Sequence, residues 1–342
     1  MNNKRSGPGW WRVAVQAIGA VLCGVSLGSP AWAQQGAGPA AASATTASTT
    51  AMAAPRPAAT TIGEKACIGC HGQENRHFTE TLHAKAFRAN PRNDRERQVC
   101  EACHGPGSLH AKNTKDKSLI IGFTKGWNTP LEQQNESCLS CHQGGNRLHW
   151  PGSTHAGNQV GCADCHNPMQ KVGNSPLLAR ATINETCASC HQQQRAEFNK
   201  RSHMPLPEGK MSCVDCHNPH GTTTKPLLKA DSVNFVCYAC HAEKRGPMLW
   251  EHAPVRENCV NCHSPHGSNH DKLLVASRPQ LCQQCHSPSV GHPGQFYRND
   301  QTAAAGQLLG GTTSQRVVGR SCQNCHTQIH GSNHPAGARF QR

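Results

Sequence analysis

The motif C-x-x-C-H constrains this chain more than any other feature, because it occurs ten times in 342 residues. The ten copies use 20 of the 21 cysteines and leave only Cys23 outside the pattern. Two thiols three residues apart with a histidine directly after them form the attachment sequence of a c-type haem. The thiols bond to the porphyrin and the histidine binds its iron. The sequence therefore predicts ten covalently bound haem c groups.

The predicted attachment residues fall into two sets. The thioether cysteines are Cys67, Cys70, Cys100, Cys103, Cys138, Cys141, Cys162, Cys165, Cys187, Cys190, Cys213, Cys216, Cys237, Cys240, Cys259, Cys262, Cys282, Cys285, Cys322 and Cys325. The proximal iron ligands are His71, His104, His142, His166, His191, His217, His241, His263, His286 and His326.

Other uses of paired cysteines explain the pattern less well. Zinc ribbons contain C-x-x-C pairs but need no histidine after each second cysteine. A disulfide framework suits an exported chain but gives no reason for ten identical spacings. Thioredoxin-like motifs occur singly, near a βαβ pattern that is not visible here.

The composition agrees with a core made largely of porphyrin. Hydrophobic residues make up 36% of the chain and aromatic residues 4%, while glycine and proline together number 54. Such a polypeptide buries little apolar surface of its own. We therefore expect a multihaem cytochrome c that is mostly coil, with short α-helices in or just before the motifs and little or no β-structure.

The motifs repeat with two periods. Successive first cysteines from Cys138 to Cys282 lie 22 to 26 residues apart. A Pro/Lys-Leu-Leu triplet precedes every second motif at Pro176, Pro226 and Lys272, so the longer repeat is a pair of motifs, 45 to 50 residues long. Five such di-haem units predict an elongated array in which each unit contacts mainly its neighbours.

Thirteen histidines remain outside the motifs, enough to give each of ten irons a second protein ligand. An iron closed in this way mainly passes electrons, whereas an open iron can bind small substrates. One candidate lies between the two motifs of each unit, and another follows the second motif in most units. The distal candidates are His83, His110, His155, His203, His220, His252, His266, His292 and His330, with His270 and His334 as the better spares and His77 and His149 as further ones. The sequence does not assign them to individual haems.

The unit that begins at Cys138 departs from this pattern. It contains Asn167-Pro168-Met169, whereas the next unit contains Asn218-Pro219-His220. Met169 either ligates the haem at Cys162, which would raise the potential of that haem, or only packs while another histidine serves.

The N-terminus has the features of an exported protein. Residues 1–33 combine basic Lys4, Arg5 and Arg12 with a short apolar run and an Ala31-Trp32-Ala33 cleavage site, which predicts a signal peptide. Residues 34–62 form an Ala/Thr/Ser/Pro-rich segment, expected to be a disordered tether. Residues 63–342 form the predicted decahaem domain, which has no apolar run long enough to cross a bilayer.

The basic charge does not indicate nucleic-acid binding. The formal net charge is +14, and removal of the signal peptide leaves 31 Lys and Arg against 20 Asp and Glu. Ten haems with two propionates each would add about −10 to −20, depending on the iron oxidation state. The mature holoprotein is thus expected to be near neutral or acidic.

The chain from residue 63 onward resembles the MtrA/DmsE-type decahaem cytochromes. The resemblance rests on ten motifs behind a cleavable signal and on phrases such as Cys103-His104-Gly105-Pro106-Gly107-Ser108-Leu109-His110 and Cys262-His263-Ser264-Pro265-His266-Gly267-Ser268-Asn269-His270. It implies a periplasmic protein that inserts into an outer-membrane β-barrel porin. There it would carry electrons between a periplasmic or inner-membrane cytochrome and extracellular acceptors or donors such as metal oxides, in some systems through a cell-surface multihaem cytochrome.

Two other functions remain as alternatives. The protein could be a soluble periplasmic shuttle or reservoir that feeds a terminal reductase, although one or two haems suffice for a shuttle. An enzyme with an open haem is disfavoured. No C-x-x-C-K variant, typical of the catalytic haem of multihaem nitrite reductases, occurs, and no P-loop, Ser-His-Asp pattern or G-x-G-x-x-G motif stands out. We therefore expect an electron-transfer protein and not an enzyme.

Overall fold

A computed structural model describes residues 58–175, 177–278, 280–286, 321–335 and 337–340 of the chain. The predicted signal peptide, most of the predicted tether and the candidate ligand His292 lie outside the described residues. Their boundaries and roles therefore stay predictions.

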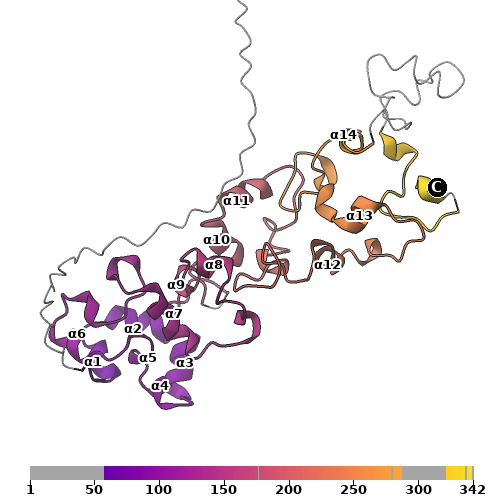
Figure 1. The fold of residues 1–342 in the computed structure, drawn as a ribbon. Helices are drawn as coiled ribbons and strands as arrows, with labels where there is room; N and C mark the ends of the chain where they lie inside the picture. Colours follow the sequence, from indigo (N-terminus) through magenta and orange to yellow (C-terminus); the bar gives the residue numbers. More distant parts are fainter. Residues whose placement is uncertain (1–57, 176, 279, 287–320, 336, 341–342) are drawn as a thin grey trace, which may run out of the picture. The chain divides into compact units, whose positions relative to one another are not determined.

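The described part of the chain consists of short helices joined by coil (Figure 1). No described α-helix is longer than nine residues, the length of α7. The α-helices are α1 (Glu64–Ile68), α2 (Gly72–Thr79), α3 (Leu82–Ala89), α4 (Asp94–Arg97), α5 (Glu101–His104), α6 (Ser108–Lys112), α7 (Leu131–Leu139), α8 (Thr154–Gly157), α9 (Cys162–Cys165), α10 (Ile183–Ala188), α11 (Gln192–Phe198), α12 (Val233–Tyr238), α13 (Ala253–Glu257) and α14 (Gln280–Gln283). The 3-10 helices are η1 (Lys117–Leu119), η2 (Lys125–Trp127), η3 (Gly145–Arg147), η4 (Cys213–Asp215), η5 (Ala242–Lys244), η6 (Cys259–Asn261), η7 (Asp271–Leu273), η10 (Cys322–Asn324) and η11 (Gly337–Arg339).

The two motifs of a unit start in different local structures. The first motif is reached at the end of a capped helix, as in α10 and α12, where the Thr182 and Ser232 hydroxyls accept hydrogen bonds from Glu185 N and Phe235 N. The second motif begins its own single turn, as in α9, η4 and η6. The prediction of short helices in or just before the motifs is confirmed.

Extended pairing is limited to isolated bridges among the described residues. Three of them recur at equivalent places and join the histidine of a second motif to a leucine of the Leu-Leu triplet: His166 to Leu178, His217 to Leu228 and His263 to Leu274. Two others, Ser202 to Ser268 and Trp250 to Ser332, join successive units. The prediction of coil with short helices and little or no β-structure is thus confirmed.

Few apolar side chains are buried among the described residues. The largest apolar cluster consists of Phe78, Ala84 and Val99, with Phe87, Cys100 and Met169 packed against it. Large apolar side chains such as Leu148 and Leu249 are 67% and 69% exposed. The polypeptide therefore supplies little core of its own, as expected for a chain that packs around porphyrin.

None of the helices in the described ranges combines the length and the apolar composition that a membrane span requires.

Candidate haem sites

Each motif folds as one helical turn. In all ten copies the histidine N–H donates to the carbonyl oxygen of the first cysteine, with N···O distances of 2.8–3.1 Å. Residues at i, i+3 and i+4 of a turn share one face. Both thiols and the imidazole are therefore presented to the same side, as attachment of one porphyrin requires. None of the 20 motif cysteines, all of which lie in described ranges, forms a disulfide.

The first cysteines of the two motifs in a unit lie side by side. In every unit their thiols are close enough to hydrogen-bond. The five pairs are Cys67 with Cys100, Cys138 with Cys162, Cys187 with Cys213, Cys237 with Cys259 and Cys282 with Cys322. Burial, followed by the charge of the neighbouring Cys67, raises the pKa of Cys100 to about 12. Each unit thus brings two attachment points into contact.

The second cysteines of successive units also lie near one another. The second cysteine of each second motif lies close enough to the second cysteine of the next unit's first motif for their charges to interact. These pairs are Cys103 with Cys141, Cys165 with Cys190, Cys216 with Cys240 and Cys262 with Cys285. Alternating first-cysteine and second-cysteine pairs therefore connect all ten motifs in sequence order.

The histidines of the second motifs are fixed by backbone carbonyls. Their Nδ1 atoms donate to carbonyl oxygens, as for His104 to Ile121 at 2.7 Å, His217 to Pro226 at 2.9 Å and His263 to Lys272 at 2.9 Å. His166 and His326 make the same contact with Leu177 and Arg339. A carbonyl can only accept, so Nδ1 carries the proton and Nε2 is left for a metal. For His166, His217 and His263 the recurring Leu-Leu triplet supplies this carbonyl, a role that its repetition alone did not reveal.

Among the described residues, seven motif histidines face a second imidazole. The distances between ring centres are 5.8–6.3 Å for His71 with His110, His83 with His142, His155 with His191, His166 with His220, His217 with His266, His252 with His286, and His263 with His330. Imidazole nitrogens bind first-row metals at about 2.0–2.1 Å. Two imidazoles on opposite sides of one iron therefore place their ring centres about 6 Å apart. The seven pairs have the spacing that a shared iron requires.

The pairs follow a rule that the sequence did not indicate. A between-motif histidine, which lies between the two motifs of its unit, faces the first motif of the next unit, as His155 faces His191. An after-motif residue, which follows the second motif, faces the second motif of the preceding unit, as His220 faces His166. His110 has no preceding unit and faces His71 of its own unit.

Burial favours the neutral imidazoles that iron ligation needs. Loss of solvent lowers the pKa of His83, His220, His252, His266 and His330, all distal candidates. The Nδ1 atoms of His83, His110 and His220 are buried without a hydrogen-bond partner in the described part of the chain.

In the described part of the chain, the candidates His203, His77, His149 and His270 do not lie opposite a motif histidine. His203 Nε2 lies 3.0 Å from Glu208 Oε1, and this carboxylate raises the pKa of His203. In the described residues neither His241 nor His104 has an opposing imidazole ring, and the spares His77 and His149 are exposed. His270 lines a second cavity, of about 470 Å³, with Arg201 and Asp271. The backbone N–H of His334 donates to Ser332 Oγ at 3.0 Å.

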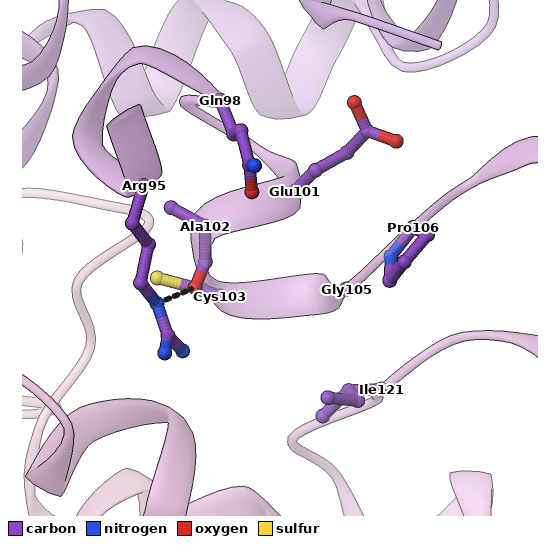
Figure 2. A pocket seen from close by; sticks show the side chains of 8 residues that line it. All are labelled: Arg95, Gln98, Glu101, Ala102, Cys103, Gly105, Pro106 and Ile121. Carbon is purple, nitrogen blue, oxygen red and sulfur yellow. Dashed lines mark hydrogen bonds between the residues drawn. The ribbon is translucent and has the colours of Figure 1, made fainter. Parts of the chain in front are cut away.

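A cavity of about 350 Å³ lies against the motif at Cys100 (Figure 2). Ala102, Cys103, Gly105 and Ile121 line it, and Arg95 closes one side by donating from Nε to the Ala102 carbonyl at 3.0 Å. Burial lowers the pKa of the adjacent His104. A hollow that contains a motif thiol fits an attached apolar group.

Two recurring structural residues escaped the sequence analysis. An asparagine three positions before the first motif accepts the N–H of the second motif's first cysteine: Asn135 from Cys162, Asn184 from Cys213 and Asn234 from Cys259, at 2.7–3.0 Å. A glycine after the after-motif histidine contacts the preceding unit. A Cβ at Gly221 would lie 2.2 Å from His149 O, and one at Gly267 would lie 2.0 Å from Glu197 O. Repetition at a fixed offset from each motif was the signal for both.

Comparison with known proteins identifies the family. The family described as "Doubled CXXCH motif" matches residues 155–196, 203–246 and 252–291, and the family described as "Cytochrome c-type protein NrfB-like" matches residues 100–174. The cytochrome c-type protein NrfB of Haemophilus influenzae is 29% identical over 133 residues, which cover 36% of this chain and 58% of NrfB. The multihaem cytochrome MtrA of Shewanella baltica is 44% identical over 280 residues, which cover 82% of this chain and 81% of that protein. The chain therefore belongs to the MtrA family of multihaem c-type cytochromes, which bind haem c through C-x-x-C-H motifs and transfer electrons.

Proposed function

We propose that all ten motifs carry haem c and that each iron is closed by a second protein ligand. The seven imidazole pairs support this ligation, because their ring centres lie 5.8–6.3 Å apart. For the haem at Cys237, the repeat rule assigns His203, the between-motif histidine of the preceding unit. In the haem-loaded protein, Nε2 of His203 would bind this iron in place of Glu208 Oε1.

Bound haem supplies an iron that alternates between the ferric and ferrous states. The chain's own residues keep the imidazoles neutral by burial and orient them through backbone carbonyls such as Ile121 O and Pro226 O. Irons with two protein ligands have no position for a substrate, so the protein is an electron carrier and not an enzyme.

We further propose that the ten haems form one uninterrupted row. The observation that carries this proposal is the alternating proximity of motif cysteines from Cys67 to Cys322, by hydrogen bonding within units and by charge interaction between units. Because these cysteines are the attachment points, consecutive haems lie close together and electrons can pass from one to the next. A long row is needed only when electrons must cross a distance.

The function best supported is conduction through the outer membrane inside a β-barrel porin. Membership of the MtrA family and the predicted signal peptide, residues 1–33, support a periplasmic origin for the mature chain. Residues 34–62 would act as a tether and residues 63–342 as the conducting domain. The donor would be a periplasmic or inner-membrane cytochrome, and electrons would pass to or from extracellular metal oxides, directly or through a surface cytochrome.

Reconstitution in vesicles tests this proposal. The holoprotein is co-expressed with a candidate outer-membrane β-barrel porin, purified, and inserted into vesicles that contain a redox dye. A conduit co-purifies with the barrel and lets an external reductant that cannot cross the membrane reduce the enclosed dye. A periplasmic shuttle remains free of the barrel and leaves the dye oxidised, although it still exchanges electrons in solution.

A further inference from the structure

The junctions between units bring two kinds of ligand candidate together. At the junction of the second and third units, Nδ1 of the between-motif His155 donates to the carbonyl of Pro219, next to the after-motif His220. At the junction of the fourth and fifth units, His252 donates to Ile329, next to His330. In each case the after-motif histidine faces back to the second motif of the preceding unit.

Met169 occupies the after-motif position of the second unit, in the same local turn as His220. Its N–H donates to Asn167 Oδ1 at 3.1 Å, as His220 N–H donates to Asn218 Oδ1 at 3.2 Å. Asn167 N–H donates to Leu177 O at 2.8 Å, and Asn218 N–H to Leu227 O at 2.9 Å. The two turns differ at the next residue, where Gln170 stands in place of Gly221.

The position of Met169 corresponds to a junction with the first unit. Its side chain packs against the cluster of Phe78, Ala84 and Val99, and Cys100 packs against the same cluster. Ala84 follows the between-motif His83, and Val99 precedes the second motif of the first unit. Met169 therefore lies among residues of the preceding unit, as the repeat rule requires of an after-motif ligand.

The motif that this rule assigns to Met169 lacks an opposing imidazole. The His104 ring makes an edge-to-face contact with Phe123, and no histidine of the described residues faces it. Its Nδ1 is tied to Ile121 O, which leaves Nε2 for iron. The Cys103 thiol of this motif borders the cavity of Figure 2.

We infer that Met169 Sδ is the second axial ligand of the haem attached at Cys100 and Cys103, opposite His104. This inference rests on the proposed attachment of ten haems, and it moves Met169 from the haem at Cys162 to the haem of the preceding unit. A thioether in place of an imidazole raises the reduction potential. The second haem of the row would therefore hold an electron more tightly than neighbours with two imidazoles.

Methyl-labelled methionine tests the ligation directly. In the ferrous, diamagnetic holoprotein, a methionine methyl bound to iron lies over the porphyrin and is shifted far upfield from the other methyl signals. We expect one such signal, its loss in Met169→Leu, and its retention in the matched control Met211→Leu. Absence of the signal in the unsubstituted protein, or its survival in Met169→Leu, overturns the inference.

A second measurement identifies the haem. Cross-relaxation between the shifted methyl and Val99 places Met169 on the haem at Cys100 without removal of any cofactor. Replacement of Cys100 and Cys103 by alanine abolishes the shifted signal, whereas replacement of Cys162 and Cys165 preserves it. The opposite result assigns Met169 to the haem of its own unit and contradicts the inference.

Restoration of the repeat gives a third test. In Met169→His every haem should remain low-spin, while the far-red sulfur-to-iron absorption disappears and one haem titrates at a lower potential. An unchanged potentiometric titration contradicts the inference. Intact mass distinguishes failure of this inference from failure of the proposed function. Ten haems without a shifted methyl signal overturn the Met169 ligation alone. The absence of haem at Cys100 and Cys103 overturns both the Met169 ligation and the proposed attachment of ten haems.

Discussion

His155 and Pro219 join two successive repeat units. The Nδ1 atom of His155 donates to the Pro219 carbonyl oxygen at 2.8 Å across a sequence separation of 64 residues. The contact fixes the His155 ring opposite His191 and places His220 opposite His166. One hydrogen bond thus positions candidate ligands for two successive haems, which ties assembly of the row to ligation of its irons.

Replacement of His220 by alanine should open one haem. The ring centres of His220 and His166 lie 6.0 Å apart with nearly parallel planes, so the iron between them would lose one of its two imidazoles. We expect a high-spin ferric signal that accounts for about one haem in the electron paramagnetic resonance spectrum. The control is His77→Ala, at an exposed residue of α2. A fully low-spin spectrum for His220→Ala would contradict the assignment.

Replacement of Gly267 by alanine should disturb both backbone and ligation. Gly267 has a φ of +151°, and an added Cβ would lie 2.0 Å from Glu197 O of the preceding unit. The strain should cost about 1–3 kcal/mol of unfolding free energy and shift His266 away from His217. Denaturant titration and the appearance of one high-spin haem measure the two effects. Gly157→Ala, where nothing lies within 4 Å of the new Cβ, should show neither.

Asn234 should stabilise the fold through three hydrogen bonds. Its Oδ1 accepts from Cys259 N at 2.7 Å, and its Nδ2 donates to the Val255 and Arg256 carbonyls at 2.9 Å each. The side chain is buried, so Asn234→Ala leaves these backbone groups unpaired and should cost about 1–3 kcal/mol. Thermal unfolding followed by the Soret signal measures the loss. The control Asn199→Ala, at an exposed residue, should leave the unfolding temperature unchanged. Equal unfolding temperatures for both variants would refute the role of Asn234.

Glu96 should contribute stability that depends on pH. Its carboxylate accepts from Arg92 N, Nε and Nη2 at 2.6–3.0 Å, and these hydrogen bonds lower the pKa of Glu96 from its usual value of 4.5. A carboxyl group whose pKa is lower in the folded than in the unfolded state stabilises the fold. This stabilisation is fully present when the pH is above the unfolded-state pKa, and it is lost as the pH falls through the folded-state pKa. Glu96→Gln should therefore be less stable than the unsubstituted protein at neutral pH, with a gap that narrows below about pH 4.5. Unfolding midpoints across this range test the prediction, and a gap independent of pH would contradict it.

The sequence predicts what is local in this fold. C-x-x-C-H spacing places the thiols and histidine of each motif on one turn, and poverty in apolar residues predicts sparse packing without sheets; the structure agrees on both. The sequence could not predict the imidazole pairs because six of the seven pairs join different repeat units, as His263 does with His330. Spacing along the chain does not report which units touch.

Met169 marks the same limit. The repeat pattern identified Met169 as unusual, but the motif nearest to it in the sequence, at Cys162, was the only haem to which the sequence could assign it. Its packing beside Ala84 and Val99 depends on a contact between units that no local pattern encodes. The sequence shows an asparagine at a fixed offset before three first motifs, at Asn135, Asn184 and Asn234. Because asparagine is common in loops, the offset alone did not indicate a role. The role follows from the hydrogen bonds that these side chains accept from Cys162, Cys213 and Cys259.

The central claim is that every motif carries a haem, so that the row has no gap. Intact mass spectrometry of the mature, natively expressed protein tests it most directly, with peptide mapping of each motif as the companion measurement. The account predicts ten covalent haem additions, one at each cysteine pair from Cys67 to Cys325. A homogeneous product with fewer additions, or with an unmodified cysteine pair inside the row, would contradict it.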